Sequence, residues 1–257
     1  MTRAVLVGIG GRMGEEILRL APEMQVQVVA GTGTGRRVPE SAARLGIPVE
    51  TDLGRALDRG ADVVIDFSSP EGCAVAARIC AERGVPLVSG TTGLDEAGFA
   101  LLRETAQRVP VLHAPNMSVG IQLLLRLVEE TARALGEGFD VEILEAHHRH
   151  KKDAPSGTAL RLAETVAAAL GRDLREDGRF GREGLVGPRP AREIGVLALR
   201  GGDVVGEHTV YFFGEGERLE LTHRASSRSA FARGALRAAR WIVGRPPGLY
   251  GMRDVLG

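Results

Sequence analysis

The histidines and lysines of this chain are concentrated in one short stretch. Residues 147–152 read HHRHKK, which includes three of the six histidines and both lysines. The other 31 basic side chains (33 − 2 = 31) are arginines. An ammonium group can share its proton, whereas a guanidinium stays charged, and histidine titrates near neutral pH. The cluster therefore predicts a site that binds acidic groups and supplies a proton to a reacting molecule.

The stretch continues into a feature that favours anions. A helix is predicted over residues 157–170, and Ser156 is placed to cap its first turn. The amides of Gly157 and Thr158 would then point into the space before the helix, where the helix dipole also favours negative charge. Together with the cationic cluster, these amides predict a small substrate that bears carboxylates.

Three other interpretations of the cluster are weaker. A zinc site would need cysteine or carboxylate ligands at suitable spacing, and the neighbouring cations oppose a metal, so we expect none. A nucleic-acid surface would need interleaved aromatic residues and a basic fold, yet acidic and basic side chains both number 33. A solvated loop would not explain why lysine and histidine gather here. His113, His208 and His223 lie in predicted strands, and we assign them no role.

A glycine-rich loop near the N-terminus predicts a dinucleotide site. Residues 8–14 read GIGGRMG, between an apolar strand and a predicted helix. Glycines at such a junction permit a tight turn and close backbone approach to a pyrophosphate, which rests on the helix N-terminus. The spacing is GxGxxxG rather than the strict GxGxxG, so a tight turn without a ligand is the alternative.

The end of the second predicted strand bears on the choice of cofactor. NAD sites usually place an acidic residue there for the ribose 2′-hydroxyl. Residues 31–37 read GTGTGRR and contain no acid. The two arginines, Arg36 and Arg37, suit a 2′-phosphate, which a guanidinium binds in a bidentate manner; a solvated arginine pair is the alternative. We therefore expect NADPH to be preferred over NADH.

The first half of the chain alternates strand-like and helix-like segments. Short, nearly all-apolar strands separated by helices are typical of a parallel sheet covered on both faces. The predicted strands are residues 4–8, 26–30, 63–67, 86–89 and 110–113, and the predicted helices are residues 13–20, 53–59, 70–83 and 95–108. The expected fold class is therefore α/β, with a Rossmann-type doubly wound parallel sheet.

The second half has a different pattern, which predicts a second domain of the α+β class with an antiparallel sheet. The expected elements are a helix at residues 118–135, strands at 139–147, 193–200, 205–213 and 218–225, and helices at 157–170 and 230–243. Residues 171–192 are rich in glycine, arginine and proline, and we expect a loop there. Residues 245–257 are expected to be irregular.

Five motifs make the chain similar to a known family. They are VGIGGRMG at residues 7–14, IDFSSPEG at 65–72, SGTTG at 89–93, APNMSVG at 114–120 and EAHHRHKKDAPSGTA at 145–159. These motifs, and the long basic one above all, resemble those of bacterial dihydrodipicolinate reductases of the diaminopimelate–lysine pathway. The resemblance covers essentially the whole chain.

The resemblance implies roles for individual residues. His147 would be the general acid, and Lys151 would assist protonation. The substrate would be bound by His148, Gly157 and Thr158. The cofactor would be bound by Gly8, Ile9, Gly10, Gly11, Arg12, Met13, Arg36, Gly90, Thr91, Thr92, Ala114, Pro115, Asn116 and Met117.

The resemblance also implies the organisation of the protein. Residues 1–118 and 229–257 would form a dinucleotide-binding domain, and residues 119–228 a mixed-sheet domain that binds substrate and builds a homotetramer. The activity would be reduction of 4-hydroxy-tetrahydrodipicolinate with NADPH or NADH, without a membrane or nucleic-acid partner.

Two other functions stay open at this point. One is another two-domain NAD(P) dehydrogenase of amino-acid metabolism, and the other is a non-catalytic dinucleotide-binding redox sensor. Cys73 and Cys80 lie seven residues apart in a predicted helix, about 10 Å along its axis, which is too far for a disulfide. We therefore expect a reducing compartment, the cytoplasm.

Overall fold

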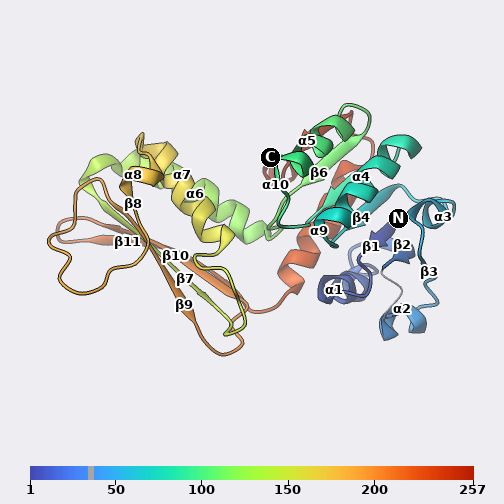
Figure 1. The fold of residues 1–257 in the computed structure, drawn as a ribbon, viewed down its shortest axis with the longest axis horizontal. Helices are drawn as coiled ribbons and strands as arrows, with labels where there is room; N and C mark the ends of the chain where they lie inside the picture. Colours follow the sequence, from blue (N-terminus) through green and yellow to red (C-terminus); the bar gives the residue numbers. More distant parts are fainter. Residues whose placement is uncertain (34–37) are drawn as a thin grey trace. The chain divides into compact units, whose positions relative to one another are not determined.

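The computed structural model describes residues 1–33 and 38–257 and divides into two compact units (Figure 1). The first unit comprises Met1–Val119 and Arg228–Gly257, and the second comprises Gly120–Ser227. Arg36, for which a cofactor role is expected, lies outside the described residues.

The first unit contains a seven-stranded sheet in which every neighbouring pair is parallel. Its strands are β1 (Thr2–Val7), β2 (Val26–Thr32), β3 (Val49–Glu50), β4 (Val63–Asp66), β5 (Leu87–Ser89), β6 (Pro110–His113) and β12 (Gly248–Tyr250), in the order β12-β6-β5-β4-β1-β2-β3. Chain order reverses between β1 and β4, where doubly wound sheets bind their ligands beyond the strand ends.

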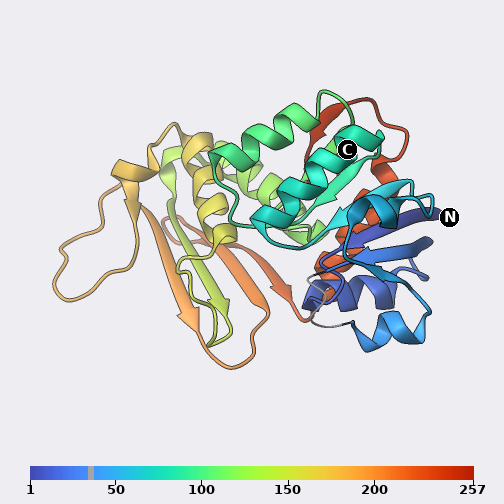
Figure 2. The ribbon, with the colours of Figure 1, turned by 45° about the vertical axis from the view of Figure 1, so that its right-hand side comes forward.

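Helices cover both faces of this sheet, as Figure 2 shows. They are α1 (Arg12–Leu20), α2 (Glu40–Arg44), α3 (Leu53–Leu57), α4 (Pro70–Arg83), α5 (Glu96–Thr105), α9 (Ser229–Ile242) and α10 (Met252–Leu256). One core cluster contains side chains of α1, α9 and α10, and the other contains side chains of α3, α4 and α5. This arrangement confirms the predicted Rossmann-type fold class. It also explains why the strands read as continuous apolar runs.

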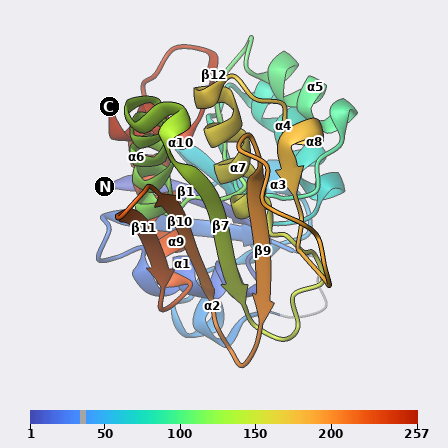
Figure 3. The same cartoon turned by 90° about the vertical axis from the view of Figure 1, so that its left-hand side faces the viewer.

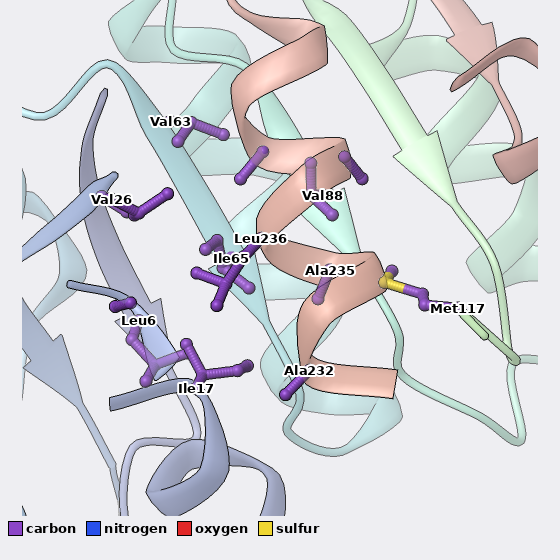
Figure 4. Packing of buried hydrophobic residues seen from close by; sticks show 14 of the residues in the cluster. Leu6, Ile17, Val26, Val63, Ile65, Val88, Met117, Ala232, Ala235 and Leu236 are labelled. Carbon is purple, nitrogen blue, oxygen red and sulfur yellow. The ribbon is translucent and has the colours of Figure 1, made fainter. Parts of the chain in front are cut away.

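Helix α9 packs against the sheet mostly through small residues (Figure 4). Ala232, Ala235 and Leu236 are fully buried beside strand residues such as Leu6 and Ile65. Short side chains let a helix backbone approach a sheet closely. The C-terminal segment therefore completes the core of the first unit, although it is distant in sequence from the other elements of that core.

The second unit is a five-stranded sheet with helices on one face, as Figures 1 and 3 show. Its elements are α6 (Val119–Leu135, which begins at the unit boundary), a 3₁₀ turn (Gly136–Gly138), β7 (Asp140–His147), α7 (Gly157–Leu170), α8 (Leu174–Asp177), β8 (Gly178–Arg179), β9 (Ile194–Arg200), β10 (Gly206–Phe213) and β11 (Arg218–Ala225). The strand order is β11-β10-β7-β9-β8. Helices α6 and α7 contribute to the core on the covered face.

Three secondary-structure predictions are wrong in part. The strand pattern indicated an antiparallel second sheet, whereas the sheet is mixed, as the family resemblance implied, because β9 runs parallel to both β7 and β8. Residues 171–192 are not entirely loop, since they contain α8 and β8. Residues 245–257 are not irregular: β12 adds a parallel strand beside β6, and α10 follows. The elements α8, β8, β12 and α10 have two to five residues each, too few for a local pattern to reveal them, and the direction of a strand depends on its distant partners.

Cys73 and Cys80 are both buried and unbridged on α4. Burial raises the pKa of the Cys73 thiol to about 12 and also raises the pKa of the Cys80 thiol. Both thiols therefore stay protonated. Within residues 1–33 and 38–257, no helix combines the length and apolar character that a bilayer crossing requires.

Candidate active site

The Glu145 carboxylate lies at the centre of the candidate site in the second unit. It is fully buried at the end of β7. Its Oε2 lies 2.6 Å from Nδ1 of His147, and Arg200 donates to Oε2 and to Oε1 at 2.8 Å each. Burial raises the pKa of Glu145, but the hydrogen bonds from Arg200, His147 and the Ser156 amide outweigh it, and the pKa lies below its ordinary value. The carboxylate is therefore charged and orients the His147 ring.

Helix α7 begins beside the same carboxylate. The Ser156 amide donates to Oε1 of Glu145 at 2.9 Å, and Ser156 Oγ accepts from the Ala159 amide at 3.2 Å. The predicted serine cap is thus confirmed. Gly157 and Thr158 form the first turn, and a Cβ at Gly157 would meet no atom within 4 Å. The predicted carboxylate-binding amides therefore lie on a helix whose start is anchored to the carboxylate group that also contacts His147, through the other oxygen.

Lys151 lies in the loop between β7 and α7. Its Nζ is 2.8 Å from Oδ2 of Asp153, and its side chain is 21% exposed. The Asp153 carbonyl accepts a hydrogen bond of 2.6 Å from Arg200. The arginine that holds the buried carboxylate therefore also holds the loop that contains Lys151. In the same loop, the rings of His148 and His150 lie 6.2 Å apart between centroids.

His208, to which the sequence assigned no role, belongs to this cluster. It lies on β10 directly opposite Glu145 in the strand register, and its ring packs edge-on against His147 with centroids 5.2 Å apart. Its Nε2 is 3.1 Å from Ser156 Oγ, and its Nδ1 has no hydrogen-bond partner among the described residues. Burial, aided by the neighbouring His147, lowers the pKa of His208 to about 4, so the ring is neutral at pH 7.

This lowered pKa predicts a pH dependence of stability. The folded protein resists protonating His208 down to pH about 4, whereas the unfolded chain binds that proton near pH 6.5. Neutral His208 therefore contributes roughly 3 kcal/mol to the free energy of unfolding. This contribution is fully present above about pH 6.5 and is lost as the pH falls toward 4. We expect the His208→Gln variant to lose less unfolding free energy over this range than the unmodified protein in urea titrations. Equal slopes for His208→Gln and the unmodified protein would refute the assignment.

In the first unit, the predicted cofactor residues lie at the carboxyl ends of three parallel strands. Residues 8–13 form the loop after β1 and the first two residues of α1, residues 90–92 follow β5, and residues 114–117 follow β6. The sheet order places β4 between β1 and β5, and β6 beside β5, so the three loops share one edge of the sheet. The structure brings these residues together within the first unit.

The side chains in these loops divide into buried and accessible ones. Ile9, Thr91, Ala114 and Met117 are all below 10% exposed, so any contact they make with a ligand would come from the main chain. Thr92 and Pro115 are exposed, and so are Gly11 and Arg12. Asn116 is half-buried, and its Oδ1 accepts the Ser118 amide at 2.9 Å.

Asp66, a buried carboxylate at the end of β4, connects the loop after β4 with β5 and with the loop after β5. It accepts hydrogen bonds from the hydroxyls of Ser68 at 2.5 Å, Ser89 at 2.8 Å and Thr91 at 2.8 Å. His113 extends the network, since its Nε2 lies 3.0 Å from the Thr91 carbonyl oxygen. The loops that follow β4, β5 and β6 are therefore held in register by side-chain hydrogen bonds.

The glycine loop fits a dinucleotide. Gly8 has a φ of +82°, and a Cβ at this position would lie 2.4 Å from the Phe67 carbonyl oxygen. The N-cap of α1 is Gly11, which has no side chain to cap the first turn. The start of α1 therefore presents its amides without a side-chain acceptor, as pyrophosphate binding requires.

Two family models match consecutive parts of the chain. One, described as dihydrodipicolinate reductase, N-terminus, matches residues 2–117, and the other, dihydrodipicolinate reductase, C-terminus, matches residues 120–256. The chain belongs to the dihydrodipicolinate reductase family. Membership confirms the resemblance noted in the sequence and makes the chain an NAD(P)H-dependent oxidoreductase.

Curated relatives agree with this assignment. The 4-hydroxy-tetrahydrodipicolinate reductase of Myxococcus xanthus (strain DK1622) is 59% identical, over 100% of this chain and 98% of its own length. The protein of the same name from Anaeromyxobacter dehalogenans (strain 2CP-1 / ATCC BAA-258) is 51% identical, with the same coverage of both chains.

Solved structures show the same relationship. A dipicolinate-bound dihydrodipicolinate reductase from Paenisporosarcina sp. TG-14 matches with a TM-score of 0.80 and 25% identity, covering 98% of this chain and 97% of that one. The WlbA dehydrogenase of Thermus thermophilus, in complex with NAD and alpha-ketoglutarate, matches with a TM-score of 0.58 and 16% identity, over 97% of both chains. The second likeness shows a shared fold alone. The comparisons therefore favour the reductase over another dehydrogenase or a redox sensor.

Sequence reasoning missed Glu145, Arg200 and Asp66, although two of them left a signal. Glu145 alternates with the apolar Val141 and Ile143 on the covered face of β7, and Arg200 occupies the same face of β9. A charged residue in phase with a buried apolar row requires a partner. Asp66 ends an otherwise apolar strand and is buried.

Proposed function

We propose that this chain reduces 4-hydroxy-tetrahydrodipicolinate through a site in which His147 is the general acid and Lys151 assists protonation. The observation that supports this most directly is the buried Glu145, which accepts hydrogen bonds from Nδ1 of His147 and from the Ser156 amide just before α7. A proton donor and an anion-binding helix start are thereby held by one carboxylate. Relatives with this name cover the full length of the chain.

The substrate-binding role of α7 follows from its position. A planar ring with a carboxylate can approach the amides of Gly157 and Thr158, with the helix dipole adding attraction. His148 lies next to the proposed general acid and is the third expected substrate ligand. The dipicolinate held by the Paenisporosarcina relative is a dicarboxylate of this kind.

The proton is delivered where negative charge develops. Reduced nicotinamide, when bound, supplies the hydride. As the unsaturated ring gains electrons, His147 and Lys151 neutralise the charge on its nitrogen system, an interaction that strengthens in the transition state and so lowers the barrier. The Lys151 ammonium lies 2.8 Å from Oδ2 of Asp153.

The cofactor is proposed to bind at the edge of the parallel sheet. Residues 8–13 would hold the pyrophosphate through main-chain amides, and residues 90–92 and 114–117 would line the nicotinamide. These assignments make residues 1–118 with 229–257 the dinucleotide-binding domain and residues 119–228 the substrate domain.

NADPH is proposed as the preferred cofactor because residues 31–37 offer two arginines and no acid to the ribose. We expect kcat/KM to be higher for NADPH than for NADH in an assay that follows loss of the reduced nicotinamide with 4-hydroxy-tetrahydrodipicolinate as substrate. An Arg36→Ala variant should lose this preference while its kcat/KM for NADH stays the same. If the unmodified protein has a higher kcat/KM for NADH than for NADPH, the proposed preference is refuted. If it reduces the substrate with neither NADPH nor NADH, the reductase function is refuted.

A homotetramer is proposed from the uncovered face of the five-stranded sheet. Tyr211 and Phe213 stack there with ring centroids 5.5 Å apart, and Leu199 is 54% exposed on the same face. Light scattering should give four times the chain mass, and a Leu199→Glu variant should give a lower mass.

As a biosynthetic reductase that draws on reduced nicotinamide, the enzyme is proposed to work in the cytoplasm.

A further inference from the structure

We propose that Glu145 is a positioning residue of this reductase: it holds the Nδ1 proton of His147, so that only Nε2 exchanges a proton with substrate, and it anchors the start of α7 with the same carboxylate. The inference rests on the proposed function, since it takes His147 as the general acid.

The contacts of Glu145 come from three separate elements and use both of its oxygens. Oε2 is shared by His147 on β7 and Arg200 on β9, and Oε1 is shared by Arg200 and the Ser156 amide before α7. All four contacts are 2.6–2.9 Å long, and the side chain is fully buried. A carboxylate held in this way cannot rotate without breaking several hydrogen bonds, so its orientation is determined.

The carboxylate determines which nitrogen of His147 transfers the proton. An ionised carboxylate only accepts hydrogen bonds, so the Nδ1 atom 2.6 Å away must bear a proton in both the neutral and the charged ring. Nε2 is then the nitrogen that gains and loses a proton. A Cβ built on Gly206 would lie 3.1 Å from Nε2, so the glycine on β10 leaves this edge of the ring uncrowded.

The proton balance of the reduction is consistent with this assignment. The 4-hydroxyl group leaves the ring as water, hydride and a proton add across one double bond of the resulting dihydrodipicolinate, and the nicotinamide is oxidised. The proton leaves Nε2 of the His147 imidazolium, and the ring is left neutral with its Nδ1 proton still on the Glu145 hydrogen bond. Solvent then returns a proton to Nε2. Without the carboxylate, the neutral ring could adopt the other tautomer and turn the wrong nitrogen toward the substrate.

The same carboxylate couples the proton donor to the carboxylate-binding turn. Ser156 both donates its amide to Glu145 and caps α7 through its hydroxyl, which also contacts Nε2 of His208. Arg200 extends the connection to the Asp153 carbonyl, two residues after Lys151. A displacement of Glu145 would therefore move the donor and the substrate-binding turn together.

Glu142 provides a matched control on the same strand. It lies three residues before Glu145 and so faces the opposite side of the sheet. It is also an arginine-paired, mostly buried carboxylate, with Arg182 donating at 3.0 Å and Arg189 at 3.0 Å. Its pKa lies below the ordinary value for the same reason as that of Glu145, because the arginine hydrogen bonds outweigh burial. Among the described residues, it contacts none of the proposed catalytic or substrate-binding residues. It lies opposite Tyr211 on the uncovered face of the sheet, so light scattering must show that Glu142→Gln keeps the oligomeric state of the unmodified protein.

The decisive experiment compares the variants Glu145→Gln and Glu142→Gln in the full-length protein. We expect both variants to lose thermal stability, because each places an amide NH₂ against arginine donors. Only Glu145→Gln should lower kcat, by about 10²–10⁴-fold as orienting carboxylates of catalytic histidines do, with the dissociation constant for NADPH unchanged. In the double variant Glu145→Gln/His147→Ala, the losses should not add, since Glu145 acts through His147.

Nitrogen NMR of His147 tests the tautomer directly. In the unmodified protein, the ¹⁵N shifts of the neutral ring should report a proton on Nδ1, and this measurement requires no variant to fold. In Glu145→Gln the signals should shift toward the Nε2-protonated tautomer, whereas Glu142→Gln should match the unmodified protein. If Glu145 had a purely structural role, Glu145→Gln would leave the tautomer of His147 unchanged and would lower kcat no more than Glu142→Gln does.

The outcomes separate this inference from the proposed function. If His147→Ala retains kcat, the general-acid assignment fails, and the inference fails with it. If His147→Ala is impaired but Glu145→Gln keeps its kcat, or the unmodified ring is protonated on Nε2 when neutral, the inference alone is overturned. Equal kcat losses in Glu145→Gln and Glu142→Gln would also overturn it, because they would reflect loss of a buried ion pair in general.

Discussion

Replacing His147 with alanine is expected to lower kcat by about 10²–10⁴-fold, the contribution of a positioned general acid. The fold should persist. The His147 side chain is 12% exposed, so its loss leaves a small, partly open space rather than a sealed cavity. Glu145 keeps three of its hydrogen bonds, from Arg200 and from the Ser156 amide. Steady-state kinetics with circular dichroism on the same samples will separate the two effects.

A similar loss of kcat is expected when Lys151 is replaced, and the neighbouring Lys152 provides the control. Lys151→Ala should lower kcat within the same range, and Lys151→Arg should not restore it, because a guanidinium keeps its proton. Lys152 is exposed and has no assigned role, so Lys152→Ala should retain kcat. Unchanged kcat in both His147→Ala and Lys151→Ala would remove the proposed proton donors from the site.

The Gly8→Ala substitution is expected to have the largest effect on stability and on cofactor binding. The left-handed backbone at φ +82° costs an alanine about 1–2 kcal/mol. The added Cβ would also lie 2.4 Å from the carbonyl oxygen of Phe67, a main-chain atom that cannot move aside without displacing the loop after β4. Such overpacking costs a further 1–3 kcal/mol or so. We therefore expect a loss of about 2–5 kcal/mol in urea unfolding and little or no NADPH binding by fluorescence titration.

Gly46 isolates the backbone part of this cost. It has a similar φ of +65°, but a Cβ there would meet no atom within 4 Å. Gly46→Ala should therefore lose only the backbone contribution of about 1–2 kcal/mol and bind NADPH normally. If Gly8→Ala and Gly46→Ala lost the same free energy of unfolding and both bound NADPH, the close packing around Gly8 would not explain why glycine is needed there.

Elements with strong local signals matched the structure closely. Helix α4 begins at Pro70 after the Ser69 cap and ends before Gly84, whose φ is +69°. Proline, serine and glycine at these positions act through their own backbone and nearest neighbours, so the chain itself specifies both ends. The helix α7 was placed correctly for the same reason, with Ser156 as its cap and Gly171 after its last turn.

Elements that depend on distant partners were not apparent. Strand β12 has three residues and forms by pairing with β6, more than one hundred positions earlier in the chain. Strand β9 was located correctly, but its direction was not, because the direction of a strand depends on how the preceding connection returns to the sheet. The segment containing α7 and α8 makes that return and leaves β9 parallel to β7.

The amino-acid sequence by itself determined the chemistry available to this protein: a confined group of histidines and lysines before a capped helix, and glycines at a strand–helix junction. These are properties of residue type and local backbone. Only the tertiary structure decided which groups act on one another, because Glu145, Arg200 and His208 come from three strands and meet through sheet pairing. The charge state of a buried carboxylate and the proton position on a histidine depend on such neighbours, and they follow from the folded arrangement.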